Sequence, residues 1–168
     1  VNYLAGWVLV HRLRPALAAA APSRVINVAS LSAAPIDFDD VTLEKPDAHA
    51  RGYGQSKLAQ VSMTVDLAPD FAKDGITMIS LHPATMMDTT MVKGAGVKPR
   101  TTVDEGRIAV MSLITAPELK AGAFYNGATL ATPHAQANDA EARAKLVALS
   151  AELTGVPVKG AVLPSARD

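Results

Sequence analysis

The sequence predicts an α/β fold built on a doubly wound parallel sheet, and three observations support this prediction. Helical and strand patterns alternate along the chain, in the order helix, strand, helix, strand, helix, strand, helix. Such alternation is typical of parallel strands joined by right-handed crossovers. Hydrophobic residues make up 49% of the chain and charged residues 19%, which excludes intrinsic disorder over most of it. Its 168 residues are enough for one domain and few for two.

The first expected helix covers residues 1–21. It is apolar on nearly every side, so we expect it to be buried between layers, and Pro15 should bend it or change its course. The chain starts at Val1 with no capping residue ahead of the helical pattern. We therefore expect it to begin inside an element, as a piece of a longer protein. Residues 24–30 are mostly apolar and β-branched, which predicts a strand buried on both faces.

Residues 31–51 are polar and irregular, and we expect them to form an inserted surface loop. A helix should follow over residues 52–73, where apolar side chains recur at helical spacing. Gly75 stands where a left-handed C-cap is needed. Residues 76–81 predict the next strand, which the dipeptide at 82–83 ends.

Thr102 and Glu105 have the spacing of a capping box, and the helix that they open should run to about Thr115. Residues 122–127 predict a short strand. No repeat or low-complexity tract interrupts this pattern.

A second capping-box pattern begins at Asn138, and Gly155 stands where its helix should end. We expect one Rossmann-like catalytic portion over residues 1–155 and a flexible tail over residues 156–168. The apolar stripe of the last helix consists of Ala142, Leu146, Leu149 and Leu153.

Composition narrows the function classes. Sixteen basic residues balance sixteen acidic ones, and the pI is near 7.1, which argues against a nucleic-acid or anionic-membrane partner. The chain has no cysteine, and its four histidines are scattered, so we expect neither a disulfide framework nor a metal site. No apolar stretch reaches transmembrane length, and no basic segment precedes an apolar run as in a secretory signal. We expect a cytoplasmic protein.

Tyr53 and Lys57 are four residues apart near the start of the second helix, so they share one helical face. A free phenol titrates near pH 10, and a neighbouring ammonium favours the phenolate. Such a pair can therefore exchange a proton closer to neutral pH. The structural alternative is a surface lysine beside a half-buried tyrosine, and the spacing alone does not decide between the two.

Two strand ends carry further candidates. Ser30 ends the first strand, and residues 83–85 end the second. Ligands of doubly wound sheets bind at the carboxyl ends of the strands. A hydroxyl at Ser30 could hold a carbonyl oxygen together with Tyr53, and the backbone of residues 83–85 could contact a bound ring. Taken singly, each is also typical of an ordinary turn or strand end.

Together, these residues resemble the second half of a short-chain dehydrogenase/reductase, over residues 2–127. The long Ser-to-Tyr loop is similar to that of the retinol-dehydrogenase-like branch. In this family an Asn, a Ser and a Tyr-x-x-x-Lys motif form a catalytic tetrad, and a His-Pro-Gly segment contacts the nicotinamide. The resemblance implies catalytic roles for Asn2, Ser30, Tyr53 and Lys57, and cofactor contacts from Tyr53, Lys57, Pro83, Ala84, Thr85 and Thr89.

The resemblance also has departures. Ala84 replaces the glycine of the family segment, and Ser32 competes with Ser30, which fits the Asn-x-x-Ser run better. The place of the family threonine falls near Asp88, so Thr89 is assigned by proximity. A glycine-rich phosphate loop is absent from the sequence, because the glycines at 94 and 96 follow no strand directly and lack a third. Truncation explains this gap better than divergence does.

The resemblance implies hydride transfer between NAD or NADP and an uncharged or weakly polar carbonyl or alcohol. In this scheme Tyr53 exchanges the proton, Lys57 supports it and holds the nicotinamide ribose, Ser30 binds the reacting oxygen, and Asn2 orders a water in the proton path. The resemblance also implies a homodimer or homotetramer. Because one sheet edge would be open, we expect the 168 residues alone to be marginally stable and to bind a dinucleotide weakly.

Two other function classes are alternatives to an oxidoreductase. A non-catalytic binding or scaffold protein that kept the fold is the main alternative. A serine hydrolase is disfavoured, because Leu58 stands where the nucleophile elbow around Ser56 would need glycine.

Overall fold

The computed structural model describes residues 1–45 and 48–156 and shows an α/β fold. Helices and strands alternate as the sequence predicts. In chain order the elements are α1 (Leu4–Ala19), β1 (Ser23–Val28), α2 (Ala48–Phe71), the 3-10 helix η1 (Ala72–Asp74), β2 (Ile76–His82), α3 (Thr90–Gly94), α4 (Val103–Thr115), β3 (Phe124–Asn126), β4 (Thr129–Ala131), the 3-10 helix η2 (Ala135–Asn138) and α5 (Ala140–Thr154).

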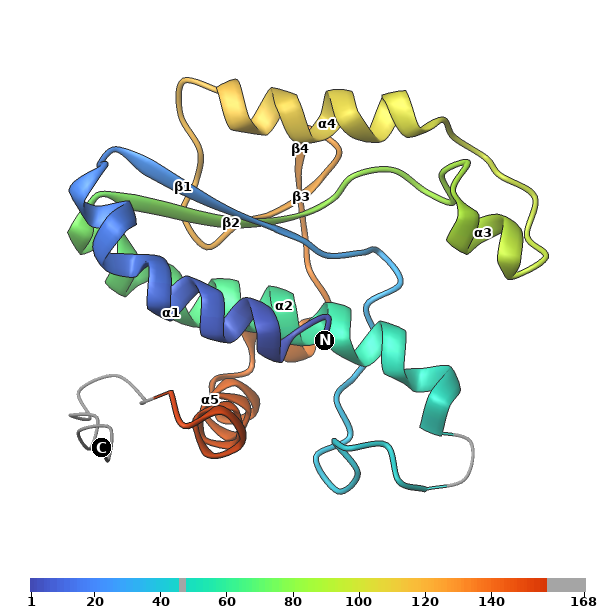
Figure 1. Cartoon of the computed structure of the whole chain (residues 1–168), viewed down its shortest axis with the longest axis horizontal. Coiled ribbons are helices and arrows are strands. Elements are labelled where there is room, and N and C mark those ends of the chain that lie inside the picture. Colours follow the sequence, from blue (N-terminus) through green and yellow to red (C-terminus); the bar gives the residue numbers. More distant parts are fainter. Residues whose placement is uncertain (46–47, 157–168) are drawn as a thin grey trace, which may run out of the picture.

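The strands form one sheet in the order β1-β2-β3-β4. β1 and β3 both pair in parallel with β2, one on each side of it. Figure 1 shows α1 and α2 against one face of the sheet and α4 against the other. Helices on both faces are the usual cover of a parallel sheet, because the crossovers between its strands place them there. The predicted doubly wound fold is confirmed.

β4 was not predicted, and it breaks the parallel pattern. It pairs with β3 in antiparallel fashion, Tyr125 opposite Leu130. Only residues 127–128 separate the two strands, and Gly127 has a φ of 59°. A connection this short can only make a hairpin, and the positive φ suits its turn. The sequence pattern predicts only one short strand in this region, over residues 122–127.

β2 is the centre of the core and is buried on both faces, as predicted for a parallel strand. Its side chains alternate between two hydrophobic clusters. Ile76 and Met78 pack with residues of α1 and α2, whereas Ile79 and Leu81 pack with Leu113 of α4 and with β3.

β1 and α1 are less buried than the sequence predicts. Within the described residues β1 pairs only with β2, so it forms one edge of the sheet. Its residues are half-buried, and Val28 at its end is 43% exposed. In α1 only Trp7 and Val10 are buried, while Leu9 and Leu13 are 56% and 50% exposed. The expectation of burial on both sides is wrong for these two elements, because the described residues leave the outer edge of β1 unpaired and cover the outer side of α1 only in part.

The segment before α2 is anchored to the fold and is more than a surface loop. Ile36 belongs to the main core cluster, and Asp40 is buried. Arg51 of α2 donates to Asp37 at 2.8 Å and to Asp40 at 3.0 Å. α2 itself begins at Ala48, earlier than expected. These contacts place the chain after β1 against the first turns of α2.

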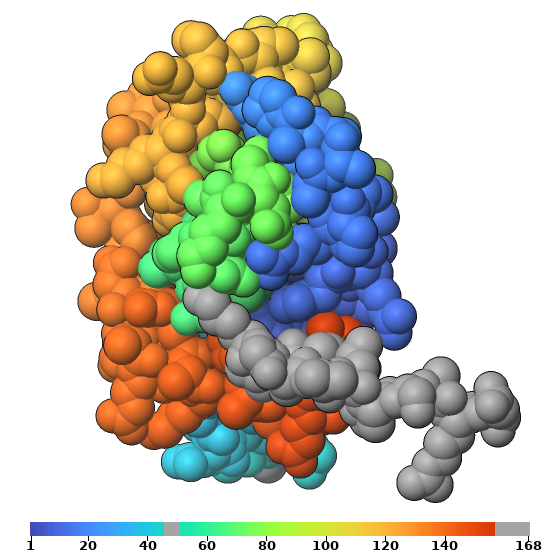
Figure 2. Space-filling view, turned by 90° about the vertical axis from the view of Figure 1, so that its left-hand side faces the viewer, coloured from blue at the N-terminus to red at the C-terminus, as the bar shows by residue number. Residues whose placement is uncertain are grey.

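An ion-pair network fastens α1 to the end of α2, at the end of the molecule that Figure 2 shows. Arg14 donates to Asp70 at 2.8 Å and to Asp74 at 2.6 Å, and its guanidinium lies 4.7 Å from the ring centroid of Phe71. Gly75 follows with a φ of 72°, which confirms the predicted left-handed C-cap.

Both ends of α4 are satisfied by side chains. Thr102 and Glu105 form the predicted capping box. At the other end, Arg24 of β1 donates to the carbonyl oxygens of Leu113, Ile114 and Ala116 at 2.9, 2.7 and 2.5 Å. Orphan carbonyls of the last helical turn thereby gain a cationic donor, which suits the negative end of the helix dipole.

The predicted cap of α5 is corrected by one residue. Asp139, not Asn138, is the N-cap, because its carboxylate accepts from the N–H groups of Glu141 and Ala142. Leu153 of the expected apolar stripe is 50% exposed. Val156 is buried, and the rest of the expected tail, residues 157–168, lies outside the described residues.

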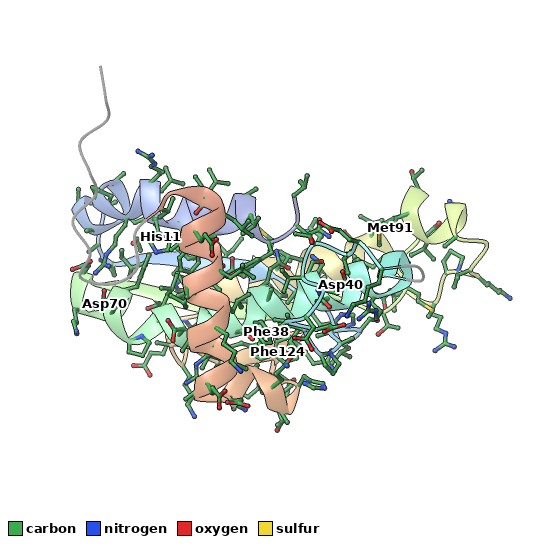
Figure 3. The ribbon with its side chains drawn as sticks, turned by 90° about the horizontal axis from the view of Figure 1, so that it is seen from below. His11, Phe38, Asp40, Asp70, Met91 and Phe124 are labelled. Atoms are coloured by element: carbon green, nitrogen blue, oxygen red, sulfur yellow. The ribbon has the colours of Figure 1, made fainter. Side chains whose placement is uncertain are left out.

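α5 crosses over α1 and α2, as Figure 3 shows from below. The hydroxyls of Tyr3 and Ser150 share a buried hydrogen bond of 2.7 Å between these helices. α5 therefore covers part of the outer side of the α1–α2 pair. None of the helices in the described ranges has the length and apolarity to cross a bilayer.

Candidate active site

A cleft of about 660 Å³ opens where β1 and β2 end. Its walls are these strand ends, the early turns of α2, and the segment around α3, which stands at one end of the molecule in Figure 1. All the residues that the sequence analysis selected line this cleft: Asn2, Ser30, Tyr53, Lys57, Pro83, Ala84, Thr85 and Thr89. The fold thus brings together candidates from four separate segments.

Lys57 is held at the cleft by two acceptors. Its ammonium donates to the carbonyl oxygen of Val28 at 2.8 Å and to Oε1 of Gln60 at 3.1 Å. An ammonium has three donors, so one is left for a bound molecule. Burial lowers the pKa of Lys57 below its ordinary value of 10.5. Tyr53 lies beside it, with its ring centroid 5.7 Å from the Lys57 Nζ atom, and is 40% exposed.

Ser30 is 5% exposed and has its hydroxyl partly engaged. Its Oγ accepts from the backbone N–H of Ser32 at 3.1 Å. Among the described residues, no hydrogen bond uses the Ser30 hydroxyl as donor, so its O–H is available to an oxygen in the cleft. Ser32 also lines the cleft, but it is exposed, and its contact with Ser30 uses its backbone. This arrangement favours Ser30 over Ser32 as the donor.

Asn2 precedes α1, which starts at Leu4, although the sequence analysis placed it within that helix. Its side-chain Nδ2 donates to Ser56 Oγ at 3.2 Å, and its carbonyl oxygen accepts from Gln60 Nε2 at 2.8 Å. Both contacts join it to α2, at the residue just before Lys57 and at the residue one turn after it.

The residues after β2 form the opposite wall. His82 is buried, and its Nε2 shares a hydrogen bond of 3.0 Å with Thr85 Oγ1. Burial lowers the pKa of His82, which favours the neutral ring. Thr89 caps α3 by accepting from the N–H of Val92 at 3.4 Å. Each threonine hydroxyl is therefore held in place at the cleft.

The mouth of the cleft near α3 is apolar. Met86 and Met91 are exposed there, and Figure 3 labels Met91 at the α3 end of the molecule. The sequence does not reveal α3, because its five residues are too few to show a helical period.

Two residues of the site escaped the sequence analysis. Gln60 contacts both Lys57 and Asn2, and its place one turn after Lys57 was the available signal. Gly54 lies between Tyr53 and Lys57, where a Cβ atom would stand 2.8 Å from both the Ser32 carbonyl oxygen and the Ala34 Cβ. The absence of a side chain at Gly54 lets the segment after Ser30 lie directly on α2.

We expect Gly54→Ala to destabilise the protein by about 1–3 kcal/mol, because the new methyl group would meet backbone that cannot rotate away. Urea unfolding measures the change. Gly6→Ala in α1 is the matched control, since among the described residues nothing beyond its own helical turn lies within 4 Å of its Cβ position. That variant should gain about 0.5–1 kcal/mol from helix propensity. Equal effects of both variants would contradict the close packing at Gly54.

No model of a protein family matches the chain. Among curated proteins, it is 32% identical to retinol dehydrogenase 13 of Homo sapiens over 177 residues, covering 93% of this chain and 53% of that protein. The Mus musculus protein of the same name is also 32% identical, over 98% of this chain and 57% of its own length. The chain spans about half the length of the curated relatives it matches.

Solved structures show the same fold. An uncharacterised protein from Mycobacterium paratuberculosis superposes with a TM-score of 0.71 at 23% identity, over 94% of this chain and 59% of that one. An NADPH-bound carbonyl reductase from chicken fatty liver superposes with a TM-score of 0.61 at 25% identity, over 79% of this chain and 54% of the reductase.

Proposed function

The chain belongs to the short-chain dehydrogenase/reductase family, and on that basis we propose that its cleft is the catalytic part of an oxidoreductase. The proposed reaction transfers a hydride between NAD or NADP and a carbonyl or alcohol carbon. The observation that carries it is the meeting of Ser30, Tyr53 and Lys57 in one cleft at the strand ends. A hydroxyl donor and a phenol with a neighbouring ammonium are the groups that proton exchange at a carbonyl oxygen requires.

The cleft suits the nicotinamide end of a dinucleotide. Lys57 has one donor left for a ribose hydroxyl, and the hydroxyls of Thr85 and Thr89 stand at the wall where a carboxamide would lie. The backbone of Pro83 and Ala84, which line the cleft, would contact the ring. A nicotinamide bound there would supply or accept the hydride. Binding of NADPH by the similar carbonyl reductase supports this choice of cofactor class.

The protein's own residues would handle the oxygen and its proton. Ser30 would donate its free O–H to the substrate oxygen, and Tyr53 would give that oxygen a proton on reduction or take one on oxidation. The positive charge of Lys57 would stabilise the phenolate that forms in the first case. Asn2 would hold the start of α1 against α2, beside this group.

The free sheet edge at β1 is a surface on which a further strand could pair. β1 pairs only with β2 among the described residues, and Val28 at its end is exposed, as are Leu9 and Leu13 of α1. We propose that the strand and helices of a nucleotide-binding half pair there and carry the phosphate contacts that no glycine-rich loop supplies in this chain.

We therefore expect the 168-residue chain by itself to bind NADH and NADPH too weakly for detection at micromolar concentrations. Half of the dinucleotide would have no contact with it. Isothermal titration calorimetry measures this directly. Micromolar affinity of the 168 residues would contradict the division of the site between two halves.

The pH dependence of the activity should be opposite to that of stability. Burial lowers the pKa of Lys57 below 10.5, so on a rising pH the ammonium loses its proton earlier than an exposed lysine would. Turnover should therefore fall as the pH rises through that lowered pKa. The unfolded chain then binds more protons at Lys57 than the folded chain, so the contribution of this residue to stability rises over the same interval. Rate profiles and urea unfolding at matched pH distinguish loss of the ammonium from unfolding.

The direct test is a hydride-transfer assay on the gene product at its full encoded length, with NADH and NADPH and a panel of uncharged carbonyl compounds. We expect oxidation of the nucleotide with at least one of them. A folded product that binds nucleotide without turnover would instead support a non-catalytic binding role. The cytoplasmic location and the homodimer or homotetramer expected from the sequence remain predictions, which cell fractionation and sedimentation would test.

A further inference from the structure

Gln60 links two groups of the cleft through both ends of its side-chain amide. Its Oε1 accepts from the Lys57 ammonium at 3.1 Å, and its Nε2 donates to the carbonyl oxygen of Asn2 at 2.8 Å. These partners belong to different segments of the chain, since Lys57 lies in α2 and Asn2 lies ahead of α1. One side chain therefore spans the space between the ammonium and the start of α1.

Gln60 is itself held in a rigid part of the fold. Its backbone carbonyl oxygen accepts from Thr64 Oγ1 at 2.8 Å, and that hydroxyl in turn accepts from Asn27 Nδ2 at 2.9 Å. Thr64 is fully buried, and Asn27 lies in β1. The turn of α2 that carries Gln60 is thus joined to the same strand whose end supplies the other Lys57 acceptor, Val28.

We propose that Gln60 is a positioning residue that orients the Lys57 ammonium for the reaction in the cleft, an inference that rests on the proposed function. A lysine side chain has four rotatable bonds, so the position of its ammonium group depends on the groups that accept its hydrogen bonds. Val28 and Gln60 accept two of its three N–H groups, and this fixes the direction of the third. Without Gln60 the ammonium would keep a single protein acceptor.

The Gln60 amide also affects whether a proton can be transferred between Lys57 and Asn2. A water between an ammonium and a carbonyl oxygen can hand on a proton, whereas an amide has no group that titrates near neutral pH. The bridge from Lys57 to the Asn2 carbonyl oxygen therefore runs through an amide. Gln60 thus makes this contact one of orientation.

The inference makes opposite predictions for two substitutions. Gln60→Leu removes the oxygen that faces the ammonium, which leaves the burial of Lys57 less compensated and lowers its pKa further. Gln60→Glu keeps the size and places a carboxylate there, which raises the pKa. A purely structural role for Gln60 would affect stability in both variants without moving the Lys57 titration in opposite directions.

The test is NMR titration of lysine ¹³Cε signals on the full chain, with the Lys57 signal assigned from its loss in Lys57→Arg. We expect the Lys57 midpoint to fall by about one pH unit in Gln60→Leu and to rise by a similar amount in Gln60→Glu. Gln55→Leu is the matched control, because Gln55 lies on the same helix but its Oε1 accepts from the N–H of Asp37. It should leave the Lys57 midpoint unchanged.

The alkaline limb of the turnover profile, measured on the full-length product, should shift in parallel, with little change in the KM of the carbonyl substrate. Unchanged Lys57 midpoints in both Gln60 variants would overturn the inference, even if the wild type transfers hydride. If the midpoints move as expected but the wild type shows no turnover, the proposed function fails and the positioning of Lys57 stands. Should Gln60→Leu not fold, the near-isosteric Gln60→Glu decides the question alone.

Discussion

Tyr53→Phe should lower hydride-transfer turnover by about 10²- to 10⁴-fold, the range typical of a lost general acid–base group. The change removes a single oxygen atom. The ring that remains still lies beside Lys57, at 5.7 Å from ring centroid to Nζ, and the side chain is 40% exposed, so the fold should be kept. Nucleotide binding should also persist, because the Lys57 donor left for a ribose does not depend on the Tyr53 hydroxyl.

Turnover and nucleotide affinity of the full-length product separate these effects. Tyr125→Phe is the matched control, since the Tyr125 hydroxyl accepts from the backbone N–H of Lys120 outside the cleft. It should affect stability slightly and leave turnover almost unchanged. Turnover close to wild type in Tyr53→Phe would remove Tyr53 from the reaction and, with it, the central step of the proposed function.

Trp7→Ala should lower the free energy of unfolding by about 3–5 kcal/mol, the largest stability loss that we expect from one substitution. Trp7 is fully buried where α1 meets α2, and its ring stacks in tilted fashion on His11 with centroids 4.3 Å apart. Truncation leaves a cavity between two helices that cannot both move inward, because Arg14 fastens their ends together. The free energy of unfolding of a typical domain is only about 5–15 kcal/mol in total.

Urea unfolding of the 168-residue chain measures this loss. Leu9→Ala on the same helix is the control, because Leu9 is 56% exposed and its removal opens no cavity. It should change stability by less than about 0.5 kcal/mol. If the two variants lost equal stability, Trp7 would not be packed as the structure shows.

Several features of the fold that depend on residues close in sequence were predicted correctly. The capping box of Thr102 and Glu105 joins groups three residues apart, and the left-handed conformation of Gly75 follows from its place after a helical pattern. The Tyr53–Lys57 pair shares a helical face for the same reason. The error at β1 has another origin: its apolar pattern is that of a central strand, but burial depends on which elements lie beside it.

The alternating order of helices and strands, the approximate ends of most of them, and the candidates Ser30, Tyr53 and Lys57 could all be derived from the amino-acid sequence. The tertiary structure alone decided that these side chains share one cleft and that Gln60 reaches Asn2 across 58 positions of the chain. Local patterns encode backbone geometry over a few residues. Contacts between distant segments depend on how whole helices pack against the sheet, and no short stretch of sequence contains that information.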